Sequence, residues 1–407
     1  MTNPALPELP VRRHPARRIG SDAEALAAAR EVAARIAEGS ARRDRERILP
    51  VAEIEAYSQS GLWGILVPRP FGGPGLSAVT LAEVTAIVSA ADASIGQIPQ
   101  NHHYMVEAIV QSGTPAQQRF FFGRVLEGDR FGNAFAEIGT KRANDYLTRL
   151  TPQPDGSFRL DGRKFYATGT LFAHWIVAVA KGHEGRTTLA FVPRGTPGLT
   201  LIDDWSGFGQ RTTGSGTVLF EAISVPPELV IDHQDAFDRP SPMGPVAQII
   251  HAAVDQGIAR AALADTIAFV QEQARPWMDS GQEHAHEDVY TIHQVGELKL
   301  KVDAGDALLE RAGELIDRAR AEPDEGSVAR ASMAVAEAKV WTTETSLLVS
   351  SKLFELAGSR ATTDRFAFDR HWRNARTHTL HDPVRWKYHH IGNFHLNGVL
   401  PPRHGAS

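Results

Sequence analysis

The chain has 407 residues, enough for several layers of secondary structure around a buried core. Hydrophobic residues make up 42% and charged residues 22% of it, and the formal net charge is −5. A slightly acidic chain without a basic stripe does not favour binding to nucleic acid. No apolar run reaches the roughly 18 residues that cross a bilayer, and no apolar core follows the N-terminal arginines as in a signal peptide. We therefore expect a cytoplasmic protein with no nucleic-acid or membrane partner.

Sulfur is scarce in this sequence. Cysteine is absent, which excludes disulfides, thiolate catalysis and cysteine-ligated metals. Only five methionines are present. Either a GC-rich genome or selection for low sulfur content accounts for this composition.

The first 130 residues predict a short arm followed by helices. Residues 1–20 are expected to form a flexible arm, and Ser21 with Glu24 predicts a capping box that starts a helix. Further helical periodicity follows Pro50 and covers residues 80–90 and 101–112. We expect residues 21–130 to form an N-terminal helical domain.

The middle and the end of the chain differ in periodicity. Turn pairs and β-rich runs near residues 158–160, 175–180, 189–192 and 218–220 predict a small antiparallel sheet or barrel in residues 131–240. Helical periodicity returns from about Pro245, and Gly358 is placed to end the third long helix. Residues 241–407 are therefore expected to form a helical bundle. The predicted fold class is α+β, mainly α.

Two motifs connect this architecture to a known family. Residues 61–76 fit the pattern G-L-x-G-x-x-V-P-x-x-[YF]-G-G-x-G-L, and residues 91–96 fit A-D-x-S-x-G. Together they resemble the acyl-CoA dehydrogenase superfamily. The resemblance implies a helical domain, a central β-domain and a C-terminal four-helix bundle, with flavin between β-domain and bundle in a homotetramer.

Near the C-terminus, His378 and His381 stand three residues apart in the stretch R-N-A-R-T-H-T-L-H-D-P. Helical spacing would place both imidazoles on one face. Where the dehydrogenases of the superfamily carry their catalytic glutamate, this chain has Asp382, followed by Pro383. The stretch resembles instead the flavin-dependent monooxygenases of the superfamily, which are similar to dibenzothiophene and methanesulfinate monooxygenases. We predict that both imidazoles act in catalysis, moving a proton to or from bound oxygen at neutral pH.

The resemblance also implies a set of flavin-binding residues in the β-domain. Asn133 corresponds to a position that faces the flavin, where its amide offers both donor and acceptor and contributes to catalysis; the alternative is a turn cap. Lys164 to Gly169 resembles a loop along the flavin edge that includes Phe165, Ala167 and Thr168. Ala167 replaces a common serine, and the hydroxyl of Thr168 could take over its hydrogen bond. Trp205 either packs on the flavin or only on its own loop.

Two arginines are expected to contact the flavin phosphate, because a guanidinium binds two oxygens at once. Arg275 occupies the bundle position that reaches the cofactor from a neighbouring subunit in the superfamily. Arg360 follows Gly358, where the family lays a loop over the cofactor. Without the resemblance, both would be interpreted as solvated surface side chains.

Other histidines provide a candidate substrate site. His102, His103 and Tyr104 begin a helix that would face the substrate cavity. A metal site is not expected, since no ligand spacing typical of metalloenzymes accompanies the histidines.

The sequence therefore predicts a two-component monooxygenase that oxygenates an organosulfur compound with O2 in sulfur acquisition. Its reduced FMN would come from a separate flavin reductase, because no Rossmann motif predicts a nicotinamide site. The alternative is an FAD-dependent acyl-CoA dehydrogenase-like oxidoreductase. A non-catalytic flavin-binding descendant is a third class, which predicts loss of the flavin-facing polar residues.

Overall fold

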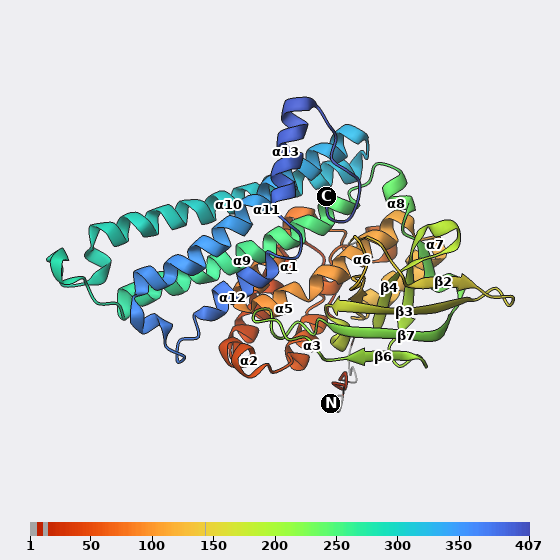
Figure 1. Ribbon diagram of the computed structural model, residues 1–407, viewed down its shortest axis with the longest axis horizontal. Helices are drawn as coiled ribbons and strands as arrows, with labels where there is room; N and C mark the ends of the chain where they lie inside the picture. Colours follow the sequence, from red (N-terminus) through yellow and green to blue (C-terminus); the bar gives the residue numbers. More distant parts are fainter. Residues whose placement is uncertain (1–5, 11–14, 143) are drawn as a thin grey trace.

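Three long helices form one side of the molecule and a β-sheet the other, with the N-terminal helices between them (Figure 1). This computed structural model describes residues 6–10, 15–142 and 144–407. The order of helices, strands and helices along the chain agrees with the predicted fold class.

The first helix begins at the predicted cap, Ser21, but the predicted capping box is only half formed. Ser21 caps the first helix by accepting a hydrogen bond from the Glu24 N–H, while the Glu24 carboxylate reaches back to the N–H of Gly20. The helices of this region are α1 (Asp22–Ala37), α2 (Ser40–Glu46), α3 (Val51–Gln59), α4 (Ala78–Ala91), α5 (Ala93–Gln97), α6 (Pro99–Ser112) and α7 (Pro115–Leu126).

The predicted flexible arm is partly packed. Residues 1–5 and 11–14 lie outside the described residues. In the described part, the N–H of Arg17 donates to the carbonyl of Gln59 at 3.0 Å, and Ile19 is buried. A buried isoleucine and a backbone hydrogen bond fix residues 15–20 against the end of α3.

Eight strands of the described residues form one mixed sheet in the order β6-β7-β3-β2-β4-β5-β8, with β1 pairing on β4. Most pairs are antiparallel, as predicted, but β1 and β2 each pair with β4 in parallel. Alternation of apolar residues locates a strand in the sequence but does not indicate which strand pairs with it. These parallel pairs were therefore not predicted. The strands are β1 (Phe131–Ala134), β2 (Arg149–Pro152), β3 (Phe158–Ala167), β4 (Trp175–Lys181), β5 (Thr187–Pro193), β6 (Leu199–Ile202), β7 (Gly216–Val225) and β8 (Val230–Asp232).

The C-terminal bundle is built around α9 (Met243–Glu272), α10 (Val289–Ala321) and α11 (Glu325–Ala357). A short helix, α8 (Asp235–Asp238), precedes them. Gly358 ends α11 with φ of 77°, as predicted, because glycine adopts positive φ without steric cost. The shorter α12 (Asp369–His378) packs on α9 and α11, and α13 (Arg385–Asn397) packs on α11. Helix α12 is the element that brings the predicted histidines into the bundle.

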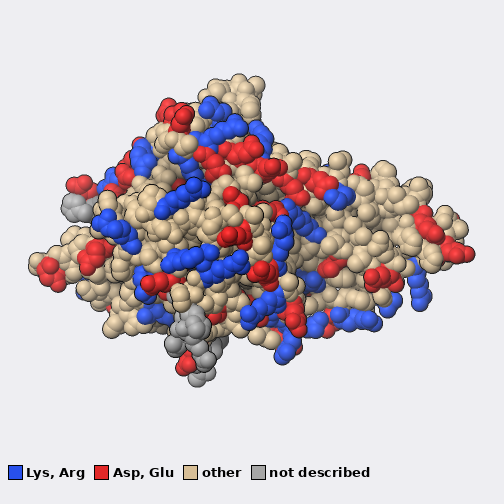
Figure 2. Space-filling model, turned by 180° about the vertical axis from the view of Figure 1, so that it is seen from behind, with Lys and Arg blue, Asp and Glu red and all other residues tan. Residues whose placement is uncertain are grey.

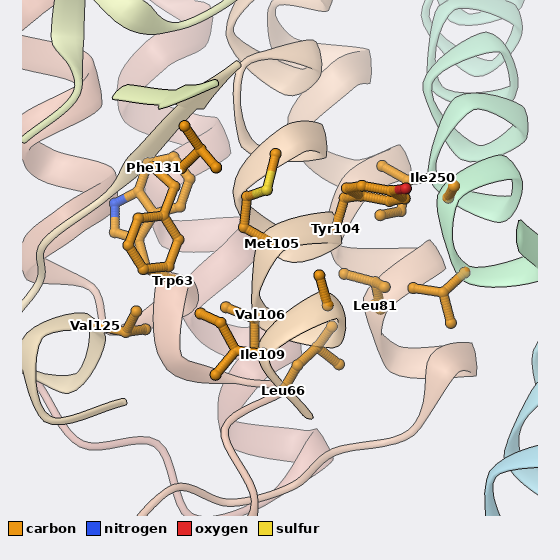
Figure 3. Packing of buried hydrophobic residues seen from close by; sticks show 14 of the residues in the cluster. Trp63, Leu66, Leu81, Tyr104, Met105, Val106, Ile109, Val125, Phe131 and Ile250 are labelled. Atoms are coloured by element: carbon orange, nitrogen blue, oxygen red, sulfur yellow. The ribbon is translucent and has the colours of Figure 1, made fainter. Parts of the chain in front are cut away.

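A hydrophobic core joins the N-terminal helices to the sheet and to α9. Figure 3 shows Trp63 and Phe131 on one side of α6, with Tyr104 on the other side pointing toward Ile250 of α9. Burial of such large side chains contributes roughly 1.5–3 kcal/mol each. The core thereby fixes α6 and β1 relative to α9.

Surface charge is mixed, and Figure 2 shows Lys and Arg side chains interspersed with Asp and Glu over that face. None of the helices in the described part of the chain combines the length and the apolar composition of a membrane span.

Candidate active site

Asn133 and Thr168 meet where β1 runs beside the end of β3. The N–H of Asn133 donates to the carbonyl of Thr168 at 3.1 Å. The hydroxyl of Thr168 lies 2.7 Å from that of Ser215, which in turn lies 2.6 Å from the hydroxyl of Thr213. The side-chain oxygen Oδ1 of Asn133 is buried and has no hydrogen-bond partner among the described residues. A buried amide oxygen without a partner is costly, so this position favours a ligand that supplies one.

Gln210 connects this strand end to α12. Its backbone N–H donates to Oδ1 of Asn374 at 2.7 Å, and its carbonyl accepts the hydroxyl of Thr213 at 3.0 Å. Both polar atoms of the Gln210 side chain are buried and unpaired within the described chain. Gln210 also adopts φ of 52°, a conformation uncommon for residues other than glycine. Strained backbone and unpaired polar atoms together are typical of a binding site.

His378 and His381 meet a third histidine, His251 of α9. Nδ1 of His251 lies 3.2 Å from Nε2 of His378, and the rings of His251 and His381 have centroids 3.9 Å apart. Burial lowers the pKa of His251 well below its usual value, and the nearby His381 lowers it further. The predicted pair is therefore part of a three-imidazole cluster, and His251 stays neutral at pH 7.

The two predicted histidines differ in exposure. The His378 side chain is fully buried, while that of His381 is 44% exposed. Helix α12 ends at His378, so His381 lies just beyond the helix and not on its face. Partial burial lowers the pKa of His381. The nearby Asp382 raises this pKa, but burial has the larger effect. His381 is thus a neutral imidazole with access to a ligand.

Asp382, which stands where dehydrogenases carry a glutamate, contacts a buried lysine and the imidazole of His381. Its Oδ1 lies 3.0 Å from Nζ of the buried Lys339 and 3.3 Å from Nδ1 of His381. Burial would raise its pKa, but Lys339 and His381 outweigh burial and hold the pKa far below the usual range. A carboxylate stabilised in this way is a weak base, which makes Asp382 poorly suited to abstract a proton.

The loop after β1 is closed by a buried ion pair. Nζ of Lys164 lies 2.6 Å from Oε1 of Glu137, and the same carboxylate accepts the backbone N–H groups of Leu147 and Thr148. Burial lowers the pKa of Lys164 to about 8. For Glu137, burial would raise the pKa, but the hydrogen bonds from Lys164 and the loop lower it. The pair holds Leu147 and Thr148 against Lys164 of β3.

His102, His103 and Tyr104 are all buried on α6. The two ring nitrogens of His102 bond to backbone, with Nε2 3.0 Å from the carbonyl of Trp63 and Nδ1 accepting the N–H of Phe131 at 3.1 Å. The hydroxyl of Tyr104 lies 2.7 Å from Nε2 of His233. Of the three, only His103 has ring nitrogens without a partner in the described structure. His103 is therefore the one of the three that retains free hydrogen-bonding groups.

The aromatic candidates of the β-domain pack on their own surroundings. The indole N–H of Trp205 donates to the carbonyl of Gln210 at 2.8 Å, and its ring approaches that of Tyr166. Phe165 is half-buried under the guanidinium of Arg163. Ala167 is fully buried in β3. Trp205 thus supports the Gln210 turn. Ala167 contributes no hydroxyl, so the hydroxyls of this strand end come from Thr168, Ser215 and Thr213.

Arg275 and Arg360 lie apart from these groups. Arg275 follows the end of α9 and Arg360 follows the end of α11, and both are exposed. These two helix ends lie at the tip of the bundle that is distant from the sheet (Figure 1). Within one chain, the structure does not bring either arginine to Asn133 or to the imidazole cluster.

Several residues of the site were not predicted from the sequence, among them Gln210, His251 and Lys339. Asp255 is another, and its Oδ1 lies 2.6 Å from Nδ1 of His378. His251 and Asp255 are one helical turn apart within an apolar stretch of α9, a pattern that marks a buried polar face. Their contacts with α12 depend on helix packing, which no local motif encodes. No group of three histidine, aspartate or glutamate side chains in the described ranges is arranged to hold a metal ion.

Comparison with known proteins agrees with this architecture. The chain matches the acyl-CoA dehydrogenase N-terminal domain over residues 22–129 and the acyl-CoA dehydrogenase C-terminal domain over residues 249–386. It is 34% identical to a dibenzothiophene monooxygenase of Rhodococcus erythropolis, over 96% of this chain and 98% of that protein. It is 31% identical to SfnC, a probable FMNH2-dependent monooxygenase of Pseudomonas putida, over 93% and 96% of the two chains.

A solved structure gives the same result. FMN-bound TdsC from Paenibacillus sp. A11-2 has a TM-score of 0.90 and 30% identity, covering 94% of this chain and 100% of TdsC. The chain therefore belongs to the acyl-CoA dehydrogenase family. Its similarity to oxygenases along nearly the whole length identifies it, within that family, as a monooxygenase, which confirms the predicted branch and enzyme class.

Proposed function

We propose that this protein is a two-component monooxygenase that takes reduced FMN from a separate flavin reductase and uses O2 to oxygenate an organosulfur compound. The observation that carries the proposal is the junction at α12. One turn of this helix separates Asn374, which holds the Gln210 turn, from His378 in the imidazole cluster. Flavin-facing groups and proton-transferring groups therefore belong to one site.

The residues at the strand end fit a flavin ring. Such a ring presents carbonyl oxygens and ring nitrogens along one edge, and these need donors and acceptors in return. Asn133 and Gln210 have buried polar atoms without partners in the described structure, and Thr168 adds a hydroxyl. FMN as the cofactor is further supported by FMN-bound TdsC and by the FMNH2-dependent SfnC.

A homotetramer would complete the site. Arg275 and Arg360 are exposed at the bundle tip, where the guanidinium groups are accessible to a phosphate carried by another subunit. Each active site would then combine the strand end of one chain with an arginine of its neighbour.

Reduced FMN, when bound, supplies the electrons that activate O2 for transfer of one oxygen atom. Asn133 and Thr168 would orient the ring. The buried surroundings of His378 and Gln210 would keep water away from it. His381 would accept or donate a proton during oxygen transfer, because its imidazole is neutral and accessible. An organosulfur substrate is supported by the similarity to the dibenzothiophene monooxygenase.

The alternative of an acyl-CoA dehydrogenase is not favoured. That reaction requires a carboxylate base, and Asp382 is held as a stable anion by Lys339. Incubation with FAD, butyryl-CoA and an electron acceptor is therefore expected to give no turnover.

The test uses the purified full-length chain, reduced FMN and dibenzothiophene. Reduced FMN is bound under anaerobic conditions, O2 is added, and oxygenated product and hydrogen peroxide are quantified. The wild type is expected to form product. His381→Ala is expected to bind reduced FMN with an unchanged Kd and to release most of the O2 as hydrogen peroxide.

A matched variant is His395→Ala, an exposed histidine of α13 outside the site, which should retain wild-type product yield. Unchanged product yield in His381→Ala would remove His381 from the mechanism. Absence of product with dibenzothiophene and with a panel of sulfones and sulfinates would refute an organosulfur substrate.

A further inference from the structure

A buried row of hydrogen bonds links α9 to α12 behind the accessible His381. Oδ1 of Asp255 lies 2.6 Å from Nδ1 of His378, and Nε2 of His378 lies 3.2 Å from Nδ1 of His251. The side chains of Asp255 and His378 are both 0% exposed. Asp255 and His251 are four residues apart, so one face of α9 presents both groups to α12.

The carboxylate determines the tautomer of His378. An ionised aspartate only accepts hydrogen bonds, so Nδ1 of His378 carries a proton and donates it to Asp255. The second oxygen of Asp255 accepts the hydroxyl of Thr343 at 3.1 Å, which keeps the carboxylate from rotating. Nε2 of His378 is then directed at His251. This is the arrangement by which a buried aspartate orients an imidazole in hydrolase triads.

His251 is the residue through which the row reaches His381. Its ring lies against that of His381, with an interplanar angle of 36°. On its other side, His381 contacts Asp382, which Lys339 holds at 3.0 Å. The position of the His381 ring is therefore set by a tilted imidazole packed against it and by a carboxylate.

We propose that Asp255 and His251 are positioning residues of the monooxygenase site: Asp255 fixes the Nδ1–H tautomer of His378, and His251 transmits that orientation to the ring of His381. This inference rests on the proposed function for its catalytic consequence. The tautomer itself is a property of the protein without ligands.

The first test is Asp255→Asn with Asp265→Asn as its matched control. Asp265 also lies on α9 and contacts a buried histidine of α12, with Oδ2 2.6 Å from Nε2 of His371. Both substitutions remove a charge from an aspartate–histidine contact between the same two helices. Only Asp255 belongs to the row that leads to His381.

The readout that does not depend on activity is the histidine tautomer. Protein labelled with 15N-histidine is measured by NMR without flavin, and the His378 signals are identified by their loss in His378→Gln. The wild type is expected to show the Nδ1–H tautomer. Asp255→Asn should shift His378 toward the Nε2–H tautomer, because the amide that replaces the carboxylate can donate to Nδ1, whereas Asp265→Asn should leave His378 unchanged. An unshifted tautomer in Asp255→Asn would overturn the inference.

The second test separates the two contacts of His251. His251→Phe keeps a ring against His381 and loses the hydrogen bond to His378, while His251→Asn keeps a polar group and loses the ring. With reduced FMN and dibenzothiophene, we expect at least about tenfold lower kcat in Asp255→Asn with little change in KM, as for a misoriented imidazole. His251→Asn should release more hydrogen peroxide than His251→Phe, because the ring of His251 packs against His381 and helps to hold it in place.

These outcomes distinguish the two proposals. A wild type that forms no oxygenated product refutes the proposed function, yet the tautomer measurement still tests the role of Asp255. Equal kcat in wild type and Asp255→Asn, or peroxide release equal to that of the wild type in both His251 variants, would refute the positioning roles.

Discussion

His102 and His103 are adjacent on α6 and equally buried, but they have opposite hydrogen-bonding states. Both ring nitrogens of His102 bond to backbone groups of Trp63 and Phe131, whereas neither nitrogen of His103 has a partner among the described residues. The first histidine therefore supports the fold. The second has two buried ring nitrogens that lack hydrogen-bond partners within the residues described, which is unfavourable. Such a residue is often retained for binding.

We predict that His103→Leu stabilises the protein or leaves its stability unchanged, while lowering affinity for substrate. Leucine removes two unpaired buried nitrogens, each of which costs roughly 1–3 kcal/mol. His102→Leu is the matched variant and should be destabilising, because it leaves a carbonyl and an N–H unpaired. Urea unfolding and the KM for substrate measure the two effects. Destabilisation by both substitutions would contradict the distinction between these neighbours.

His103 also predicts a dependence of stability on pH. Burial lowers its pKa from 6.5 to about 3, so the unfolded chain binds a proton more readily than the folded one. This contribution to stability is complete above pH 6.5 and is lost as the pH falls from 6.5 toward about 3. Between pH 7 and pH 5 the wild type should lose ~2 kcal/mol from this histidine alone.

The measurement is the free energy of unfolding at pH 7 and pH 5 in wild type and His103→Leu. The variant should show a smaller loss by about that amount. His284→Leu, which replaces an exposed histidine, is the control and should follow the wild type. If wild type and His103→Leu lost the same free energy of unfolding between pH 7 and pH 5, protonation of His103 would not destabilise the fold.

The ion pair between Lys164 and Glu137 predicts a large effect of single substitutions. Both side chains are buried, so Lys164→Met leaves the Glu137 carboxylate without its cation. We expect a loss of about 3–5 kcal/mol, as for other broken buried pairs. The double variant Lys164→Met with Glu137→Gln should recover part of that loss, because no buried charge remains unpaired.

The control for this pair is Arg159→Ala, which breaks an exposed ion pair with Asp161 on the same strand, β3. It should change stability little, since solvent screens exposed pairs. Urea unfolding distinguishes these outcomes. A double variant that is less stable than both Lys164→Met and Glu137→Gln would show that the hydrogen bonds of Glu137 hold the loop. The pairing of its charge with Lys164 would then not be the main contribution.

Several features were predicted from sequence because they depend on neighbouring residues. Ser21 caps α1 and Gly358 ends α11 through contacts within a few residues, so the local pattern was sufficient. Of the imidazole cluster and its aspartate, the sequence predicted His378 and His381 but not His251 and Asp255. His378 and His381 are close in sequence, but His251 and Asp255 meet them across a helix interface. The parallel pairing of β1 with β4 was missed for the same reason.

Gly96, the last residue of the A-D-x-S-x-G motif, occupies a position where the structure leaves no room for a side chain. A Cβ added at Gly96 would lie 2.5 Å from Cα and 2.7 Å from the backbone nitrogen of Ser89, so α5 approaches α4 too closely for any side chain. Gly96→Ala should therefore destabilise by roughly 1–3 kcal/mol, since backbone must move to admit the methyl group. Gly123 in α7 is the control, because a Cβ there meets no atom within 4 Å.

Gly123→Ala should stabilise by about 0.5–1 kcal/mol, as alanine restricts the unfolded chain and favours helix. Thermal unfolding of the two variants measures both the expected loss of stability in Gly96→Ala and the expected gain in Gly123→Ala. Because α5 leads directly into α6, we also expect Gly96→Ala to raise the KM for substrate through displacement of His103, whereas Gly123→Ala should leave KM unchanged. A destabilised Gly96→Ala variant with wild-type KM would show that the close approach of α4 and α5 serves the core and not the site.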